Sequence, residues 1–376
     1  MSDARIPLAR PSFGEDELAL ATSVLMSGQL TMGPALRRFE EAVRGACDTG
    51  YAVGCTNGTA ALHLTLLALG VGPGDEVVVP AYTFPATANA AVHTGASVVF
   101  CDVEPGRDVS GPDQVAAALT ERTKAVMLVH LFGCPADVAG VRAVTDAAGV
   151  ALVEDAAGAL GTSCDGRPAG SSGVAGCLSF HPRKAVTTGE GGAIVTNDAA
   201  LAERLRALRH HGIHDGEFVD IGLNYRLSDV LAVLALPQLE RLDDIVDARR
   251  WQAAIYDAAL AELPGMDAAC SGCTNMHEGD RHSYQAYVAH CDPELRDGLV
   301  RMLRERGVEA QVGTYCVPNL APYRSRGYAP ADTPNAVTAA ASGIALPLFI
   351  GLRESEQEQV IETLGACLEQ PDALRA

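Results

Sequence analysis

Seven short apolar runs alternate with helical segments between residues 51 and 198, and this alternation restricts the fold more than any other feature of the chain. The runs are YAVGC, EVVVP, SVVFCDV, KAVMLVHLFG, VALVEDA, GCLSFH and GAIVTND. They are apolar throughout rather than at every second residue, so we expect strands that are buried on both faces. Strands separated by helices form a largely parallel sheet with helices on both faces. The sequence therefore predicts an α/β fold.

The segments outside this region predict further helices and a second, smaller α/β unit. Helical patterns cover residues 15–28, 35–46 and 198–212, and a longer helical pattern, interrupted near Pro237, covers 216–263. Beyond it the pattern alternates again, with strand-like stretches at 282–291 and 308–318 and helices at 292–307 and 355–370. We therefore expect a large N-terminal domain at residues 1–245 and a small C-terminal domain at residues 246–376.

The chain is strongly acidic, with 28 Lys+Arg against 47 Asp+Glu and a formal net charge of −19. This balance argues against nonspecific binding to nucleic acid or to an anionic membrane, although a few placed groups could still bind an anionic ligand. The N-terminal sequence MSDARIPLARPSFGEDEL has no apolar signal region, and no apolar run approaches the length of a membrane span. We expect a cytoplasmic protein without a nucleic-acid or membrane partner.

Eleven cysteines are scattered without framework spacing, which favours reduced thiols in the cytoplasm. One C-x-x-C pair occurs, at Cys270 and Cys273. A zinc site would need two further ligands, for which Cys291, His277 and His282 are near in sequence. Because no second metal-type pair follows, an ordinary loop is the favoured interpretation, and we expect no metal.

A single lysine, Lys184, lies between two of the apolar runs, in the stretch SFHPRKAVTTGEGG at residues 179–192. Burying an ammonium group is costly unless its pKa falls. A lysine in a buried framework is therefore either a structural accident or an amine adjusted for Schiff-base chemistry with a carbonyl. Most lysines are solvated and catalyse nothing, so other features of the sequence must decide between these two interpretations of Lys184.

Three other features lie beyond the carboxyl ends of predicted strands, where open α/β sheets bind ligands. Gly58 and Thr59 open a helix whose free N–H groups could hold a phosphate, although for this turn alone a simple helix cap is the favoured interpretation. Phe84 could stack on a flat ring or pack in the core. Asp155 could pair with a protonated ring nitrogen or cap a helix. With Lys184, these are the parts that pyridoxal phosphate requires, and one cofactor site explains all four together.

Motifs for other cofactors and reactions are absent from the sequence. It contains no G-x-G-x-x-G after the first strand, no G-x-x-x-x-G-K-[ST] and no G-x-S-x-G nucleophile elbow. Pyridoxal phosphate therefore remains the cofactor that these residues favour.

Along nearly its whole length the sequence resembles the DegT/DnrJ/EryC1/StrS sugar aminotransferases, pyridoxal-phosphate enzymes of the aspartate aminotransferase fold (fold type I). The resemblance rests on IPLARPSFGEDEL, SGQLTMGP, TNGTAALHLTLLALGVGPGDEVVVPAYTFPATANA, VEDAAGALG, SFHPRKAVTTGEGGAIVTND, GLNYRLSD and LPLF. It implies a mostly parallel seven-stranded sheet flanked by helices, with a smaller C-terminal α/β domain.

The implied reaction moves an amino group from glutamate or glutamine to a nucleotide-activated keto-deoxysugar. We take a dTDP-4-keto-6-deoxyhexose as the leading substrate, in amino-sugar biosynthesis for a natural product such as an antibiotic or for a surface glycan. Three other interpretations stay open. The first is amination of a non-nucleotide cyclic ketone, such as a keto-inositol or an aminobenzoate precursor. The second is a dehydratase, whose lysine would be a histidine, and the third is a non-catalytic regulatory protein on this fold.

The resemblance also assigns roles around the cofactor. Lys184 would form the Schiff base and move protons, Asp155 would keep the pyridine nitrogen protonated, and Phe84 would stack on the ring. Asn224, in GLNYRLSD, would reach the phosphate of the partner subunit's cofactor, which implies a homodimer with shared active sites. The expected phosphate ligands within the same chain are Gly58, Thr59 and Ser179, and the expected substrate-side residues are Thr31, His181 and Tyr315.

Two positions depart from the family pattern. Gly158 stands where a Gln or His usually follows D-A-A near the cofactor. In YCVPNLAPY, Asn319 and Ala321 stand where the small domain often carries a histidine. These departures leave the local contacts with cofactor and substrate open.

Overall fold

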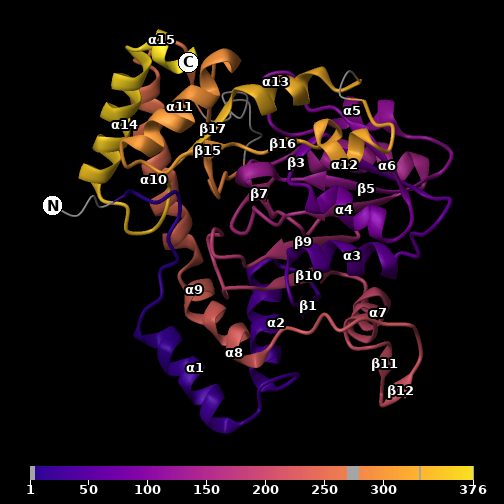
Figure 1. The fold of residues 1–376 in the computed structure, drawn as a ribbon. Helices are drawn as coiled ribbons and strands as arrows, with labels where there is room; N and C mark the ends of the chain where they lie inside the picture. Colours follow the sequence, from indigo (N-terminus) through magenta and orange to yellow (C-terminus); the bar gives the residue numbers. More distant parts are fainter. Residues whose placement is uncertain (1–4, 269–278, 330–331, 376) are drawn as a thin grey trace.

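The protein is described by a computed structural model that covers residues 5–268, 279–329 and 332–375. A large sheet with helices on both faces makes up one part, and a smaller unit built mainly from the C-terminal third of the chain lies beside it (Figure 1).

The large sheet has seven strands in the order β1-β10-β9-β6-β5-β2-β4. β10 runs antiparallel to both of its neighbours, and the remaining pairings are parallel. The predicted mostly parallel sheet is therefore confirmed. The strands span Tyr51–Cys55 (β1), Glu76–Pro80 (β2), Ser97–Cys101 (β4), Thr123–Val129 (β5), Ala151–Asp155 (β6), Ala175–Ser179 (β9) and Gly192–Thr196 (β10).

Two apolar cores cover the two faces of this sheet, because its strands are apolar on both sides. One face packs against α3 (Gly58–Ala68), α4 (Ala86–His93) and α7 (Ala199–Arg209). The other packs against α2 (Pro34–Ala46), α5 (Pro112–Ala118) and α6 (Val138–Ala148).

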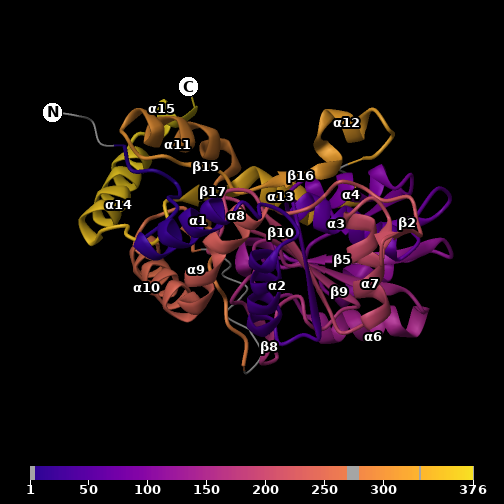
Figure 2. The same ribbon diagram turned by 90° about the horizontal axis from the view of Figure 1, so that it is seen from below.

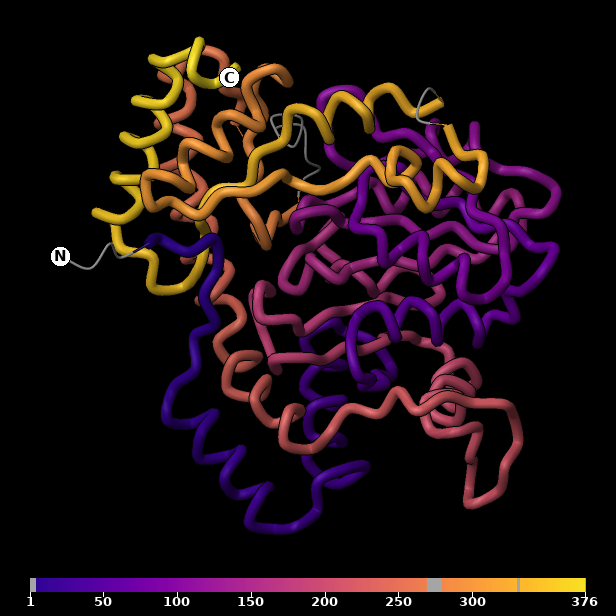
Figure 3. Tube along the Cα trace, viewed as in Figure 1, coloured from indigo at the N-terminus to yellow at the C-terminus, as the bar shows by residue number. Residues whose placement is uncertain are grey.

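The small unit is a four-stranded sheet in the order β13-β14-β17-β15, covered by helices. Ile6 belongs to its core and pairs with Val308, so the first described residues pack here before the chain runs on to α1 (Figure 3). The elements are β13 (Met266–Asp267), β14 (Tyr287–Cys291), β15 (Gln311–Val312), β17 (Gly343–Leu346), α10 (Leu242–Leu260), α11 (Pro293–Glu305), α14 (Glu354–Leu368) and α15 (Pro371–Arg375).

Shorter elements join the two parts. β16 (Tyr315–Cys316) comes directly after β15 of the small sheet but pairs with β3 (Tyr82–Thr83) beside the large one. α13 (Pro334–Ser342) contacts both α11 and β3, and it lies between the two parts in the view of Figure 2. The remaining elements are α1 (Glu15–Ser27), β7 (Ser163–Cys164), β8 (Arg167–Pro168), α12 (Ala321–Arg324) and the 3₁₀ turns Leu131–Gly133 and Val317–Asn319.

The sequence pattern did not predict three local features. The helix α4 begins only at Ala86, because Tyr82 and Thr83 pair with β16. The stretch 308–318 is not one strand, since β15 and β16 belong to different sheets. The strand β17 was not predicted at all.

The long helical pattern over 216–263 also divides differently from the prediction. It begins with a hairpin of β11 (Ile213–His214) and β12 (Glu217–Phe218), and helices start only at α8 (Asp229–Ala232). A 3₁₀ turn (Val233–Ala235) and α9 (Leu236–Glu240) follow before α10. Pro237 lies in the first turn of α9, where a missing N–H costs nothing, so it does not itself break the helix. The predicted domain boundary at residue 245 falls inside α10, which runs through it without a break, so this boundary stays a prediction.

Eight described cysteines are free and buried, but Cys134 is disulfide-bonded, which departs from the expectation of reduced thiols. The C-x-x-C pair and His277 lie outside the described residues, so the zinc alternative is not tested. Within the described ranges, no three His, Cys, Asp or Glu side chains are grouped as a metal site would require. No helix in those ranges has the length and apolar character needed to cross a membrane.

Asp229 ties α2 to the region that follows the hairpin. Its buried carboxylate accepts hydrogen bonds from the N–H groups of Gly33 (2.9 Å), Ala35 (3.1 Å) and Leu36 (3.4 Å). These N–H groups lie at the start of α2, where the helix has no carbonyl to accept them. A negative charge is favourable at this end of a helix.

We expect Asp229→Ala to lower the free energy of unfolding by about 2–4 kcal/mol, because buried N–H groups would lose their acceptor. Asp198→Ala is the matched control, since Asp198 caps α7 at an exposed position and should cost only about 1 kcal/mol. Urea denaturation at one fixed protein concentration measures both values. Equal losses for the two variants would contradict this account of Asp229.

Candidate active site

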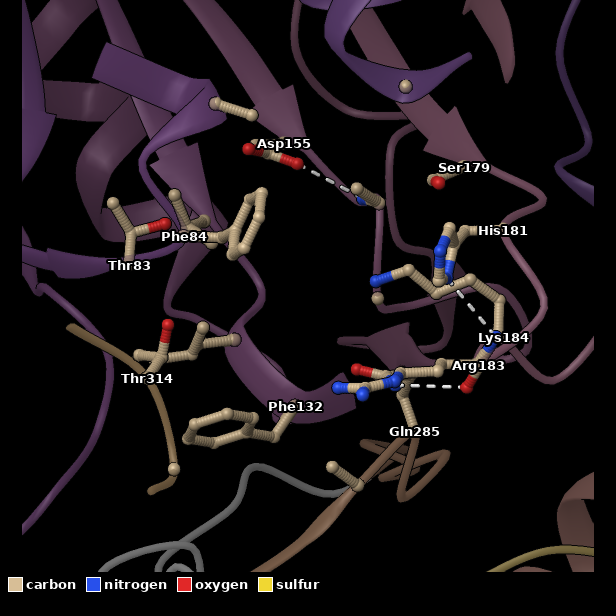
Figure 4. Close-up of a pocket in the computed structure, with 18 of the residues that line it drawn as sticks. Thr83, Phe84, Phe132, Asp155, Ser179, His181, Arg183, Lys184, Gln285 and Thr314 are labelled. Carbon is tan, nitrogen blue, oxygen red and sulfur yellow. Dashed lines mark hydrogen bonds between the residues drawn. The ribbon is translucent and has the colours of Figure 1, made fainter. Parts of the chain in front are cut away.

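A cavity of about 690 Å³ lies beyond the carboxyl ends of β6 and β9, with the small unit forming its other wall. Eight of the ten residues predicted for the site line it, and Figure 4 shows several of them facing one another. They are Gly58, Thr59, Phe84, Asp155, Ser179, His181, Lys184 and Tyr315.

The start of α3 forms an anion cradle on one side of the cavity. The side chain of Asn57 accepts the N–H of Ala60 (2.8 Å), and its carbonyl accepts the N–H of Ala61 (3.1 Å). The backbone amides of Gly58 and Thr59 have no hydrogen-bond partner within the described part of the chain. Free amides at a helix N-terminus are suited to a phosphate group.

Two glycines allow this cradle to lie close to the strand ends. A Cβ on Gly58 would lie 2.8 Å from the Cβ of Ser179, and a Cβ on Gly192 would lie 2.3 Å from the carbonyl oxygen of Asn57. Any larger residue would push α3 away from β9 and β10. The last glycine of the G-E-G-G stretch is therefore required for close packing, whereas Gly189, with φ +83°, makes the turn.

Asp155 ends β6 and faces the cavity, with only 5% of its surface exposed. Its Oδ2 accepts the Thr87 hydroxyl (2.8 Å), and its Oδ1 accepts the N–H of Ala157 (3.1 Å). Burial raises the pKa of this carboxyl, and these two hydrogen bonds oppose that rise. A buried carboxylate of this kind gains from a cationic partner, which a protonated pyridine nitrogen supplies.

Thr87 is a positioning residue that we did not single out from the sequence. It lies inside the quoted stretch TFPATANA, one helical turn after Phe84, so the signal was a hydroxyl on the helix face next to the predicted ring contact. Glu154, next to Asp155, does not line the cavity. It is buried against His130 (2.9 Å) and accepts backbone N–H groups of residues 170–173.

Lys184 follows β9, and its backbone N–H donates to the carbonyl of His181 (2.8 Å). Its side chain extends into the cavity on the same side as Asp155 and Phe84 (Figure 4). Desolvation lowers the pKa of the ammonium to about 8, the carboxylate of Asp155 opposes this shift, and Arg183 and Arg249 add to it. A sizeable fraction of this amine is therefore unprotonated and nucleophilic near neutral pH.

Phe84 is not a core residue, because 62% of its surface is exposed. The pairing of β3 with β16 brings Tyr315 opposite Thr83, and the ring centroids of Phe84 and Tyr315 lie 6.5 Å apart. The structure therefore removes the core-packing alternative and leaves the Phe84 ring open at the cavity for stacking.

Thr31 and Asn224 do not line the cavity of their own chain. Thr31 forms a bridge with Ser228. Asn224 is exposed, and the next residue, Tyr225, accepts the backbone N–H of Thr56 directly before the cradle (2.9 Å). The role of Asn224 toward a partner subunit stays a prediction.

The two departures from the family pattern have different surroundings. Gly158 lines the cavity, and the nearest atom to a Cβ built there is Oε1 of Gln285, at 3.1 Å. Gln285, from the small unit, therefore fills the space that a longer residue 158 would need. Asn319 lies in a 3₁₀ turn, Ala321 opens α12, and neither lines the cavity.

These groups fit pyridoxal phosphate. The cradle suits its phosphate, Asp155 its ring nitrogen, Phe84 its ring and Lys184 its aldehyde carbon. The fold and the cavity together define a pyridoxal-phosphate-dependent enzyme of fold type I.

Comparison with known proteins leads to the same class. A model of the DegT/DnrJ/EryC1/StrS aminotransferase family matches residues 11–365. The spore coat polysaccharide biosynthesis protein SpsC of Bacillus subtilis (strain 168) is 35% identical over 379 residues, which cover 96% of each chain. The chain belongs to the DegT/DnrJ/EryC1/StrS aminotransferase family, and it is a pyridoxal-phosphate-dependent sugar aminotransferase.

Solved structures agree with this assignment. The aminotransferase TlmJ from Streptoalloteichus hindustanus is 35% identical and superposes with a TM-score of 0.91, over 97% of this chain and 99% of that one. The pyridoxal-phosphate form of Spr1654, a putative sugar aminotransferase from Streptococcus pneumoniae, is 27% identical with a TM-score of 0.91, over 97% and 99% of the two chains.

The lowered pKa of Lys184 predicts how its reactivity depends on pH. Because only the unprotonated amine attacks an aldehyde, capture of added pyridoxal phosphate by the cofactor-free protein should rise through about pH 8 and then level off. Lys124, the only other lysine in the chain, is exposed and serves as an internal control for a lysine outside the cavity. Borohydride trapping followed by peptide mass spectrometry measures both sites.

Asp155→Asn should move the Lys184 midpoint to lower pH, because the Asp155 charge raises the pKa of that ammonium. A midpoint for Lys184 near about 10.4, the value of a free lysine, or a shift to higher pH in Asp155→Asn, would contradict the electrostatic account.

Proposed function

We propose that this enzyme transfers an amino group from glutamate or glutamine to a nucleotide-activated keto-deoxysugar. The leading substrate is a dTDP-4-keto-6-deoxyhexose, and the product is an amino sugar for a surface glycan or a natural product such as an antibiotic. The observation that carries the proposal is a lysine of lowered pKa beside a buried carboxylate, in a cavity walled by both parts of the chain. The name of SpsC, a spore coat polysaccharide biosynthesis protein, supports a glycan product.

The protein's own residues supply proton transfer and orientation. Pyridoxal phosphate, when bound, supplies an aldehyde and an electron-withdrawing ring. In the first half-reaction Nζ of Lys184 takes a proton from Cα of the amino donor. In the second half-reaction it gives a proton to the sugar carbon that receives the amine. Throughout, Asp155, held by Thr87 and Ala157, keeps a proton on the ring nitrogen.

The proposal includes a homodimer in which Asn224 completes the partner's site. Three apolar side chains just before Asn224 are largely exposed, at 77% for Phe218, 60% for Val219 and 94% for Ile221. An exposed apolar segment is typical of an interface. The proposal also includes a cytoplasmic location.

Lys184→Ala should retain the fold and lose more than about a thousandfold in transamination rate, because the proton carrier is removed. The test uses glutamate and glutamine as donors with a panel of ketones: dTDP- and UDP-linked keto-sugars, a keto-inositol and pyruvate. Conversion of a nucleotide keto-sugar supports the proposal. Turnover of only the free cyclic ketone would replace it with that alternative, and unchanged turnover by Lys184→Ala would refute the mechanism.

Shared sites predict complementation between two inactive variants. Asn224→Asp places a negative charge where we expect the partner's cofactor phosphate, so it should bind the cofactor weakly. When Lys184→Ala and Asn224→Asp subunits are co-expressed in equal amounts, half of the dimers are hybrids with one intact site. About a quarter of the wild-type activity should therefore return. Failure to recover activity in purified hybrids would place Asn224 outside the partner's site.

A further inference from the structure

Arg183 is an arginine without a carboxylate partner at the edge of the active-site cavity. Many arginines in this acidic chain lie within ion-pair distance of Asp or Glu, but Arg183 has no such partner anywhere in the described residues. Among the described residues that line the cavity, Arg183 is the only arginine and Lys184 the only lysine. Lys184 is used for chemistry, which leaves one guanidinium unassigned.

Two glutamines from the small unit hold this arginine in place. Its Nη1 donates to Oε1 of Gln311 (2.9 Å), and its backbone carbonyl accepts Nε2 of Gln285 (3.2 Å). Gln285 is itself fixed, because Arg249, buried in α10, donates to its backbone carbonyl (3.1 Å). Figure 4 shows Arg183 and Gln285 side by side below the Lys184 side chain.

This arrangement positions the guanidinium and leaves most of its donors available to a ligand. Within the described residues, only one of its five N–H donors has a hydrogen-bond partner in the protein, the neutral amide oxygen of Gln311. A guanidinium in a fixed orientation loses little entropy when it binds a second acceptor, and its planar fork matches a carboxylate or a phosphate. The side chain is exposed, so a ligand in the cavity can reach it.

We propose that Arg183 binds an oxyanion of the substrate and is a specificity-determining residue of this enzyme. The inference rests on the proposed function, in which both substrates carry such a group: the amino donor has carboxylates and the keto-sugar has a diphosphate. Because the two substrates enter the cavity one after the other, the same guanidinium can serve either. Gln285 and Gln311 are the residues that position it.

Binding of unreactive probes to the cofactor-loaded enzyme tests the assignment without turnover. Glutarate carries the two carboxylates of the donor but has no amine, and dTDP carries the diphosphate but has no sugar. Isothermal titration measures both affinities in wild type, Arg183→Gln, Arg183→Lys and Gln311→Leu. Arg324→Gln, an exposed arginine of α12 outside the cavity, controls for the change in net charge.

We expect Arg183→Gln to weaken the binding of at least one probe by about 10- to 100-fold, because a charge-assisted hydrogen bond is lost. Arg183→Lys should recover part of that loss, Gln311→Leu should show a smaller loss, and Arg324→Gln should match wild type. If Arg183→Gln binds only glutarate more weakly, Arg183 binds the carboxylate of the donor. If it binds only dTDP more weakly, Arg183 binds the diphosphate. Weaker binding of both probes assigns one subsite that serves both substrates.

Three results would overturn the assignment: unchanged affinities in Arg183→Gln, an equal loss in Arg324→Gln, or no binding of either probe to wild type. Arg183→Gln should still bind the cofactor and develop its visible absorbance band, because the cradle, Asp155 and Lys184 are unchanged in this variant. Probe binding that depends on Arg183 in an enzyme that aminates no ketone would refute the proposed function but retain this inference.

Discussion

The close approach of α3 to the ends of β9 and β10 determines the whole site. It exists because Gly58 has no side chain to strike Ser179, and Gly192 has none to strike the carbonyl of Asn57. The helix N-terminus is thereby brought against the strand that leads directly to Lys184. Phosphate binding and Schiff-base chemistry thus depend on one packing contact, and an added methyl group at either glycine would separate them.

Electrostatics at the site follow from placing two opposite charges in a poorly solvated cavity. Burial raises the pKa of Asp155 and lowers that of Lys184, and the charge of each residue opposes the shift of the other. For the lysine, desolvation prevails, which gives a reactive amine near neutral pH. For the carboxyl, desolvation also prevails and raises the pKa, while the Thr87 hydroxyl and the Ala157 amide limit that rise.

The pattern of apolar runs and short motifs predicted the strands and site residues that depend only on nearby sequence. The largely apolar run EVVVP forms a strand that is buried on both faces. Asp155, at the end of a predicted strand, and Lys184, in its sequence motif, both line the cavity as predicted. The sequence pattern did not predict features that depend on pairing between residues far apart in the chain. Tyr315 joins β3 rather than the small sheet, and the segment between Phe218 and α8 is not helical, with its Tyr225 accepting the backbone N–H of Thr56. Gln285 and Gln311 belong to no motif, so only the fold brings them to the cavity.

This division separates cofactor binding from substrate recognition. The groups that suit the cofactor all come from the large sheet and its loops, and each is marked by a local signal. Arg183 lies on the same loop as Lys184, but its orientation comes from Gln311 and Gln285 in the small unit. A change in how the small unit packs would therefore move the guanidinium while leaving the cradle and Asp155 in place.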